Sequence, residues 1–275
     1  MVRKLVGSIA SVWRYPVKSM LGEKLNASEV TVHGLLGDRA YALLDVPSGK
    51  VASAKNPKKW AKLLEFQATF AETPHQDQSI PPVKIFLPEG NSITSEAPDI
   101  NEILSNSLGT EVKFLSAAPE AASLDHYWPA VEGTTHQDVM TQIVMPPGTF
   151  FDACSIHAIT TATLARLQEL YPEGQFEPCR FRPNLVIEPT SREIKFLEDD
   201  WVGGILAIGE AVRLTIDKPC PRCVVTTLAQ PGLPEDKNIL LTTARYNKVI
   251  AGIRTSVLQG GTIRCNDPIW LEKTA

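Results

Sequence analysis

Short runs in which apolar and polar residues alternate fill the first 116 residues of the chain. Alternation with a period of two is typical of strands that bury one face of a sheet. Gly and Pro separate the runs, as at Gly37 and Pro81-Pro82, and mark turns. Many short strands at this spacing favour a barrel or a sandwich. The runs predict strands over residues 8–15, 29–32, 39–45, 65–70, 83–87 and 112–115.

Two segments have the periodicity of a helix instead. The first follows Asp99, a typical N-cap residue, with Glu102 three residues on and Gly109 as the stop signal. The second starts near Thr160 and ends at Pro172-Glu173-Gly174. Their apolar residues recur on one face of each helix, at Ile100, Ile103, Leu104 and Leu108 and at Leu164, Leu167 and Leu170. We expect both helices to pack on the outside of the strands.

Periodicity fails between residues 116 and 150, where Pro and Gly are frequent. Such a segment is typical of an interdomain connection or an active-site lid. Further strands are predicted at residues 182–187, 209–216, 224–228 and 268–271. The pattern therefore predicts an α+β fold, mainly β, with a barrel-like domain at 1–116, a linker or lid at 117–150 and a second domain at 151–275.

Composition limits the possible functions. The net charge of −4 gives no general attraction to nucleic acid, which requires a basic face. Five cysteines without regular spacing argue against a disulfide framework and for a reducing compartment. The N-terminus lacks the apolar core of a signal peptide, and no run approaches the about 18 apolar residues of a membrane span. We therefore expect a soluble, cytoplasmic protein without a membrane span.

The strongest chemical signal is the turn Cys220-Pro221-Arg222-Cys223. Thiolates bind soft or high-valent metals, and a neighbouring arginine lowers the pKa of a thiol. A thioredoxin-like dithiol would open a helix, but the β-branched residues that follow favour a strand. A structural zinc site would need a second close pair of ligands, whereas the other cysteines are scattered singly. The turn indicates a metal or redox site, and two cysteines that only pack in a loop are the remaining alternative.

Three further motifs accompany this turn in a fixed order: Trp13-Arg14-Tyr15-Pro16-Val17-Lys18-Ser19, Gly37-Asp38-Arg39-Ala40-Tyr41 and Cys179-Arg180-Phe181-Arg182-Pro183-Asn184. Together the four motifs resemble the MOSC-domain family, which includes the mitochondrial amidoxime reducing component and its bacterial relatives. The resemblance implies a MOSC N-terminal β-barrel domain packed on a β-barrel-like MOSC domain with a few outer helices. It also implies binding of molybdenum cofactor, a pterin that carries a dithiolene and a phosphate.

The resemblance also assigns roles to individual residues. Cys223 becomes the catalytic residue and the molybdenum ligand, and Cys220 a nearby structural thiol. Asp152 is expected to accept hydrogen bonds from the pterin ring. The other residues that it implies for cofactor binding are Lys18, Ser19, Arg39, Arg182, Asn184, Pro221 and Arg222.

The chain departs from the family pattern at several positions. Ala153 and Cys154 stand where two small hydroxylated residues are usual, and Ala229 replaces an aspartate after the cysteine turn. Cys154 and Cys265 are interpreted as packing residues. None of the histidines, His33, His75, His126, His136 and His157, has the spacing of a ligand set, and none is assigned a role.

These residues favour a molybdenum-dependent oxidoreductase of the amidoxime-reductase type, which reduces small N-hydroxylated substrates. The sequence contains no flavin, nicotinamide or haem motif. Electrons are therefore expected from a separate protein, by resemblance a cytochrome b5 with its reductase or a ferredoxin-like protein.

Two alternatives remain from the sequence. One is a cofactor binding or carrier protein related to the C-terminal domain of the molybdenum cofactor sulfurases, a relationship that associates the chain with pyridoxal phosphate binding. The other is a structural protein whose site has decayed, which the departures at Ala153, Cys154 and Ala229 support.

Overall fold

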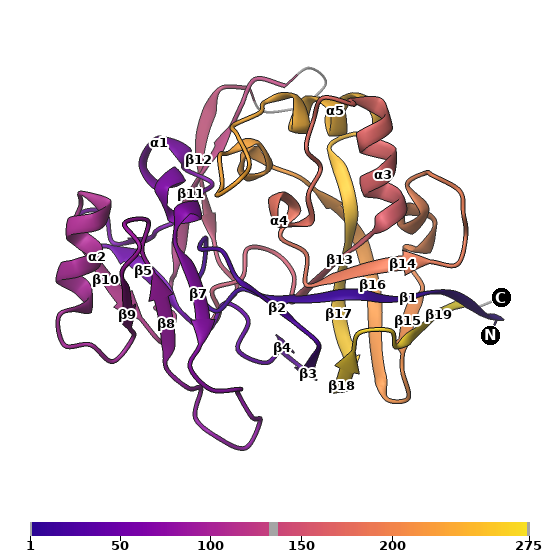
Figure 1. Cartoon of the computed structure of the whole chain (residues 1–275), viewed down its shortest axis with the longest axis horizontal. Coiled ribbons are helices and arrows are strands. Elements are labelled where there is room, and N and C mark those ends of the chain that lie inside the picture. The colour runs from indigo at the N-terminus through magenta and orange to yellow at the C-terminus, as the bar shows by residue number, and fades with distance from the viewer. Residues whose placement is uncertain (1, 132–136, 274–275) are drawn as a thin grey trace.

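Strands dominate the structure, a computed structural model that describes residues 2–131 and 137–273 (Figure 1). The strands are β1 (Val2–Arg14), β2 (Glu23–Leu25), β3 (Ala27–Thr31), β4 (Gly34–Leu35), β5 (Ala42–Asp45), β6 (Lys50–Val51), β7 (Gln67–Phe70), β8 (Val83–Phe86), β9 (Ser92–Thr94), β10 (Val112–Leu115), β11 (Ser123–Trp128), β12 (Val139–Val144), β13 (Ile156–Thr160), β14 (Leu185–Pro189), β15 (Ile205–Ile208), β16 (Val212–Pro221), β17 (Ile250–Gln259), β18 (Gly261–Arg264) and β19 (Pro268–Lys273).

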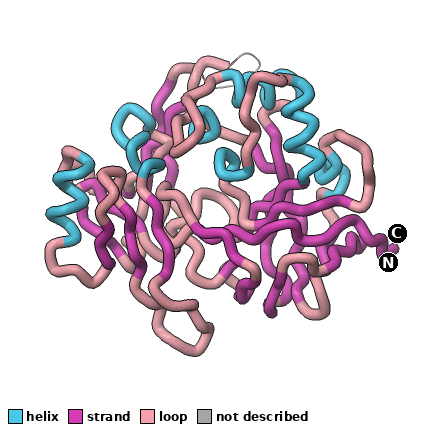
Figure 2. Tube along the Cα trace, in the orientation of Figure 1, coloured by secondary structure: helices cyan, strands magenta, loops and turns pink. Residues whose placement is uncertain are grey.

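Short helices lie mainly on the outside of these strands (Figure 2). The α-helices are α1 (Pro57–Trp60), α2 (Ile100–Leu108), α3 (Thr161–Leu170), α4 (Pro178–Phe181) and α5 (Asn238–Asn247). The 3-10 helices are η1 (Ala61–Glu65), η2 (Leu197–Trp201) and η3 (Val224–Thr227). The predicted α+β, mainly β fold is confirmed.

A closed barrel of seven strands forms the larger lobe. The strands follow the order β14-β13-β17-β16-β15-β19-β1, and β1 pairs again with β14 to close the ring. Closure removes the unpaired strand edges that an open sheet would present. Fully buried apolar side chains such as Ile9, Leu185, Leu206 and Ile253 belong to its core. Because β1 belongs to this ring, the first residues of the chain are part of the same barrel as residues 156–273.

The smaller lobe has a separate core around Leu43, Leu63, Phe66 and Ile85, all at most 1% exposed. Two three-stranded sheets, β10-β5-β6 and β7-β8-β9, supply part of this core, and α2 packs against β10 (Figure 1). The predicted domain division at residues 116 and 150 stays a prediction.

Both predicted helices are present. The Thr160 side chain caps α3 by accepting a hydrogen bond from the Thr163 backbone N–H at 3.1 Å. Gly109 ends α2 in the left-handed conformation, with φ of 71°, which glycine adopts without steric cost. Asp99 is the N-cap residue of α2, as predicted, although its side chain forms no capping hydrogen bond.

One predicted strand is absent. Residues 224–228 do not form a strand, since η3 occupies 224–227. The hydroxyls of Thr226 and Thr227 donate to the carbonyls of Cys223 and Val224 at 3.0 and 2.8 Å, so local bonds override the β propensity of this run. The segment 117–150, for which the pattern predicts no strand, contains β11 and β12, which pair as an antiparallel hairpin, and its role as a linker or lid stays a prediction.

Strands lie at all the other segments for which the pattern predicts them, with ends shifted by a few residues. Among the described residues, no helix combines the length and the apolar character needed to cross a membrane.

Candidate functional site

One pocket brings together every residue that the sequence assigned to a site. Its lining includes Lys18, Ser19, Arg39, Asp152, Arg182, Asn184, Pro221, Arg222 and Cys223. It also includes residues to which the sequence gave no such role, among them Lys55, Cys154, His157, Cys220 and Arg254.

The register of the barrel explains this convergence. A continuous row of paired residues runs across five strands: Val12 to Leu185, Leu185 to Ala158, Ala158 to Ile253, and Ile253 to Pro219. Three of the four motifs lie at or near the end of β1, before β14 and at the end of β16, so the pairing carries these segments, distant in sequence, to one end of the barrel. The fourth motif, Gly37–Tyr41, lies between β4 and β5 and is held beside the segment after β1 by backbone hydrogen bonds from Arg39 to Tyr15 and from Tyr41 to Pro16.

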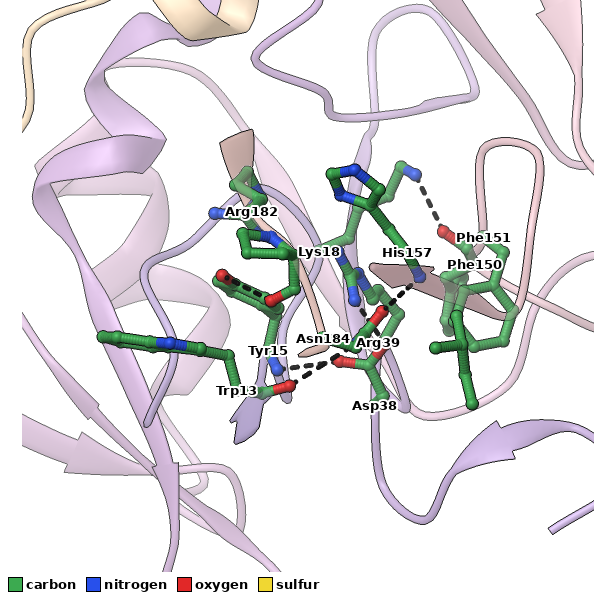
Figure 3. Close-up of polar contacts among 12 residues, drawn as sticks. Trp13, Tyr15, Lys18, Asp38, Arg39, Phe150, Phe151, His157, Arg182 and Asn184 are labelled. Atoms are coloured by element: carbon green, nitrogen blue, oxygen red, sulfur yellow. Dashed lines mark hydrogen bonds and ion pairs between the residues drawn. The ribbon is translucent and has the colours of Figure 1, made fainter. Parts of the chain in front are cut away.

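Tyr15 forms a platform for two arginines (Figure 3). The guanidinium carbons of Arg39 and Arg182 lie 4.5 and 4.3 Å from its ring centroid, close enough for cation–π attraction. Burial raises the pKa of Tyr15, and the two arginines oppose this. Arg39 also forms an ion pair with Asp38, and Arg182 donates to the Met20 carbonyl at 2.7 Å. Both arginines are thus oriented before any ligand binds.

Positive backbone φ angles mark three of the predicted residues. Ser19, Arg39 and Arg182 have φ of 64°, 50° and 51°, in the left-handed region that residues other than glycine rarely adopt. Such conformations cost on the order of 1 kcal/mol or more and often occur at functional sites. Their presence at three lining positions of one pocket supports a binding role for this end of the barrel.

Asp152 lies between two lysines. The Lys18 ammonium donates to its Oδ1 at 2.5 Å, and Lys55 lies 3.3 Å from its Oδ2. Burial raises the pKa of Asp152, but Lys18 and Lys55 lower it more, so this carboxyl has a pKa well below its usual range. Lys18 also donates to the Phe150 carbonyl at 2.7 Å (Figure 3). Asp152 therefore binds lysines within the protein, and its expected contact with the pterin stays a prediction.

The Asn184 side chain is largely used inside the protein. Its Nδ2 donates to Asp38 Oδ2 at 3.0 Å and to the Trp13 carbonyl at 3.3 Å (Figure 3). Its Oδ1 accepts from the backbone N–H of His157 at 3.1 Å. Since an amide has two N–H donors, only the oxygen retains capacity for a ligand. Asn184 thus connects β1, β13 and the start of β14, a structural role that the sequence did not predict.

The cysteine turn is held by contacts of Arg222. Its Nη1 donates to Cys220 Sγ at 2.9 Å and lies 3.4 Å from His157 Nε2, while its Nη2 donates to the Phe181 carbonyl at 2.5 Å. Burial raises the pKa of the Cys220 thiol, but His157 and Arg222 lower it more, so its pKa lies well below the usual value. Cys220 therefore acts as an acceptor for the Arg222 side chain.

Cys223 is half-buried and lies at the N-terminal end of η3. Like the other four cysteines it is a free thiol. The residues of η3 are in turn held by Arg180, a fully buried side chain whose Nη1 donates to the carbonyls of Thr226 and Leu228 at 3.3 and 3.2 Å. The backbone around the predicted metal ligand is thereby fixed.

His157 is the residue of the site that sequence reasoning missed most clearly. A buried imidazole lies here, and its Nε2 is 3.2 Å from the Ala251 carbonyl. A Cβ at Gly252, where φ is 88°, would lie only 2.4 Å from that Nε2, so the ring needs glycine at this position. In a sequence, a single histidine within an apolar run does not by itself indicate a functional site. His33, His75 and His126 do not line the pocket, and His136 lies outside the described residues.

The closed barrel and the arginine-rich pocket with its cysteine turn define the class of protein. The profile of the MOSC N-terminal beta barrel domain matches residues 6–78 and that of the MOSC domain matches residues 147–270, so the chain belongs to the MOSC-domain family. Membership of this family points to a function related to the molybdenum cofactor.

Two human proteins are among its relatives. The chain is 26% identical over 295 residues to mitochondrial amidoxime reducing component 2, a match that covers 96% of this chain and 83% of the relative. It is 26% identical over 293 residues to mitochondrial amidoxime-reducing component 1, covering 97% and 83%. The crystal structure of the YUAD protein from Bacillus subtilis has a similar fold, with a TM-score of 0.50 and 10% identity over 100% of this chain and 99% of that protein.

Proposed function

We propose that this protein is a molybdenum-cofactor-dependent oxidoreductase that reduces N-hydroxylated, amidoxime-type substrates with electrons from a separate protein. One observation carries the proposal. Within the described residues, two buried guanidinium nitrogens of arginines that line the pocket near the Tyr15 platform and the cysteine turn have no hydrogen-bond partner, Arg182 Nη2 and Arg222 Nε. A buried donor without a partner is costly, so their presence beside the free thiol of Cys223 supports an anionic, metal-containing ligand.

The residues present fit molybdenum cofactor. Arg182, Arg39 and Lys18 would hold its phosphate, because guanidinium and ammonium groups form charge-assisted hydrogen bonds to phosphate oxygens. Arg222 would donate to the pterin, and the Cys223 thiolate would complete the coordination of the metal. When bound, the cofactor supplies two-electron redox chemistry that no side chain offers.

The reaction converts an amidoxime, two electrons and two protons into an amidine and water, with cleavage of the N–O bond. The protein contributes orientation. Arg39 and Arg182 are held on Tyr15, and Arg222 is held by Cys220, so these groups need little rearrangement when the anionic ligand binds. The names of the human relatives support the amidoxime substrate class. By the same relationship, the electron donor is a cytochrome b5 with its reductase or a ferredoxin-like protein.

A comparison of two cysteine variants tests the proposal. In protein from a host with intact cofactor synthesis, we expect Cys223→Ala to lose benzamidoxime reduction with a viologen donor and to lose the thiolate contribution to the molybdenum X-ray absorption spectrum. Pterin content should stay high, since the phosphate contacts are separate from the metal ligand. Cys220→Ala is the matched control and should keep molybdenum and turnover.

Two results would contradict this function. If Cys220→Ala abolishes metal ligation while Cys223→Ala does not, the assignment of the ligand is wrong. If wild-type protein loaded with cofactor shows no oxidation of viologen on addition of an N-hydroxylated substrate, the carrier function is favoured instead.

A further inference from the structure

The lining of the pocket has an excess of positive charge. Its cationic side chains are Lys18, Arg39, Lys55, Arg182, Arg222 and Arg254, whereas its only acidic side chain among the described residues is Asp152. Asp152 already pairs with Lys18 and Lys55, and Arg39 pairs with Asp38 beneath the pocket. Two intramolecular carboxylates thus oppose six cations, and this excess of positive charge favours anionic ligands in the pocket.

Arg254 lies at the cysteine end of this pocket, apart from the Tyr15 platform. It is on β17, directly opposite His157 of β13, so the two side chains extend from the same face of the sheet. His157 in turn contacts Arg222 of the cysteine turn. The two arginines on Tyr15, which Figure 3 labels, come instead from the segment between β4 and β5, which holds Arg39, and from the end of α4 before β14, which holds Arg182.

Lys55 lies at the same end as Arg254. The pKa of Lys55 is raised: burial and the positive charge of Arg254 lower it, but Asp152 and Cys223 raise it more. These influences place Lys55 within electrostatic range of both the predicted metal ligand and Arg254. Its side chain is 15% exposed, so its charge is only partly screened by water.

Arg254 has an unused binding capacity. Across residues 2–131 and 137–273 it forms no ion pair, and its buried Nε has no hydrogen-bond partner. A guanidinium binds a carboxylate in bidentate fashion through two parallel N–H donors. The position of Arg254, beside the cysteine turn rather than at the Tyr15 platform, suits a ligand that approaches the metal.

We propose that Arg254, assisted by Lys55, binds a carboxylate of the substrate, so that the protein selects N-hydroxylated compounds that also carry a carboxylate. This inference rests on the proposed function and names the substrate class of that same site. The carboxylate neutralises the excess positive charge at the cysteine end and directs the N-hydroxyl group toward the metal bound by Cys223.

The test compares para-carboxybenzamidoxime with para-carbamoylbenzamidoxime, a neutral compound of nearly the same shape, using a viologen donor and loaded protein. We expect kcat/KM to favour the carboxylate about tenfold or more, which corresponds to one charge-assisted pair. Arg254→Gln should bring this ratio close to one, and Lys55→Gln should reduce it in part. Arg192→Gln, which removes an exposed arginine outside the pocket, is the matched control and should keep the wild-type ratio.

Molybdenum and pterin contents of each variant provide a readout that is independent of activity. If Arg254→Gln loses cofactor, Arg254 serves the cofactor and the inference is overturned. A wild-type ratio near one overturns it too, although the proposed function then stands.

If loaded wild-type protein reduces neither compound, the proposed function fails, and binding decides the inference separately. Isothermal titration calorimetry should then show that the carboxylate compound binds wild type about tenfold more tightly than it binds Arg254→Gln. Equal affinities would overturn the inference.

Discussion

Arg180 offers the sharpest test of how the fold supports the site. Its side chain is completely buried on α4, and it donates to four backbone carbonyls. These belong to Gln175 at 2.9 Å, Thr226 at 3.3 Å, Leu228 at 3.2 Å and Pro234 at 2.7 Å. The guanidinium thus ties α4 to η3 and to the loop that follows it. Substitution by alanine removes all four bonds and leaves a cavity.

The magnitude follows from these contacts. A hydrogen bond from a charged donor contributes about 1.5–3 kcal/mol, but four bonds from one group are not additive, and the cost of burying the charge offsets part of the gain. We expect Arg180→Ala to lower the free energy of unfolding by at least about 4 kcal/mol, since buried carbonyls lose their partners and packing is lost. For a protein of this size, that loss corresponds to a decrease in Tm of about 8–16 °C.

Thermal unfolding followed by circular dichroism measures this decrease. Arg180→Lys should recover only part of the stability, because an ammonium cannot reach four carbonyls arranged around a planar guanidinium. Arg166→Ala is the matched control: Arg166 pairs with Glu169 on the surface of α3, with both side chains at least 40% exposed, and should change Tm by less than about 3 °C. A decrease for Arg180→Ala that is no larger than that of the control would refute the reasoning.

Three other predictions concern groups in the pocket. Because the pKa of Asp152 is lowered in the folded protein, its contribution to stability is complete above its unfolded pKa of about 4 and is lost as the pH falls below it. Unfolding of Asp152→Asn in denaturant should therefore depend less on pH in the acidic range than unfolding of wild type, and equal slopes would contradict this. Because the pKa of Cys220 is lowered, its thiolate absorbance in cofactor-free protein should appear at a lower pH than that of an ordinary cysteine; Cys220→Ser should remove this absorbance and His157→Gln should shift it to higher pH. Gly252→Ala should lower the free energy of unfolding by about 2–4 kcal/mol in denaturant titrations. The reason is that the new Cβ would lie 2.5 Å from the Ala158 carbonyl oxygen, at a residue with a positive φ. An unchanged denaturation midpoint would show that the backbone relaxes without cost.

The sequence predicted those elements whose signals are local. Thr160 caps α3 and Gly109 ends α2, because capping depends on residues within one turn of the helix. The residues that the resemblance assigned to the site line one pocket, and all of them except Asp152 lie in the four short motifs, while their roles stay predictions. By contrast, the strand predicted at 224–228 failed because the hydroxyls of Thr226 and Thr227 bond locally to preceding carbonyls.

Elements whose signals are not local could not be predicted. β17 has register shifts against β16, and Gly252 within it has a positive φ, so its side chains do not follow a simple period of two. The N-cap residue of α5, Lys237, forms no side-chain capping hydrogen bond. The sequence of β12, Val-Met-Thr-Gln-Ile-Val, does not alternate apolar and polar residues, and its apolar Val144 is 72% exposed.

The position of His157 shows why the site also depends on strand register. Its backbone N–H bonds to Asn184, its ring contacts the carbonyl of Ala251, and the same ring lies beside Arg222. These contacts come from strands that pair in one row, so a slip of one residue between β13 and β17 would turn the imidazole to the other face of the sheet. Closure of the barrel by β1 and β14 prevents such a slip, since each strand is paired on both sides. The pairing that builds the barrel thus also fixes the arginines and the cysteine turn, which explains how residues more than two hundred positions apart, such as Arg39 and Arg254, form one rigid site lined by cations.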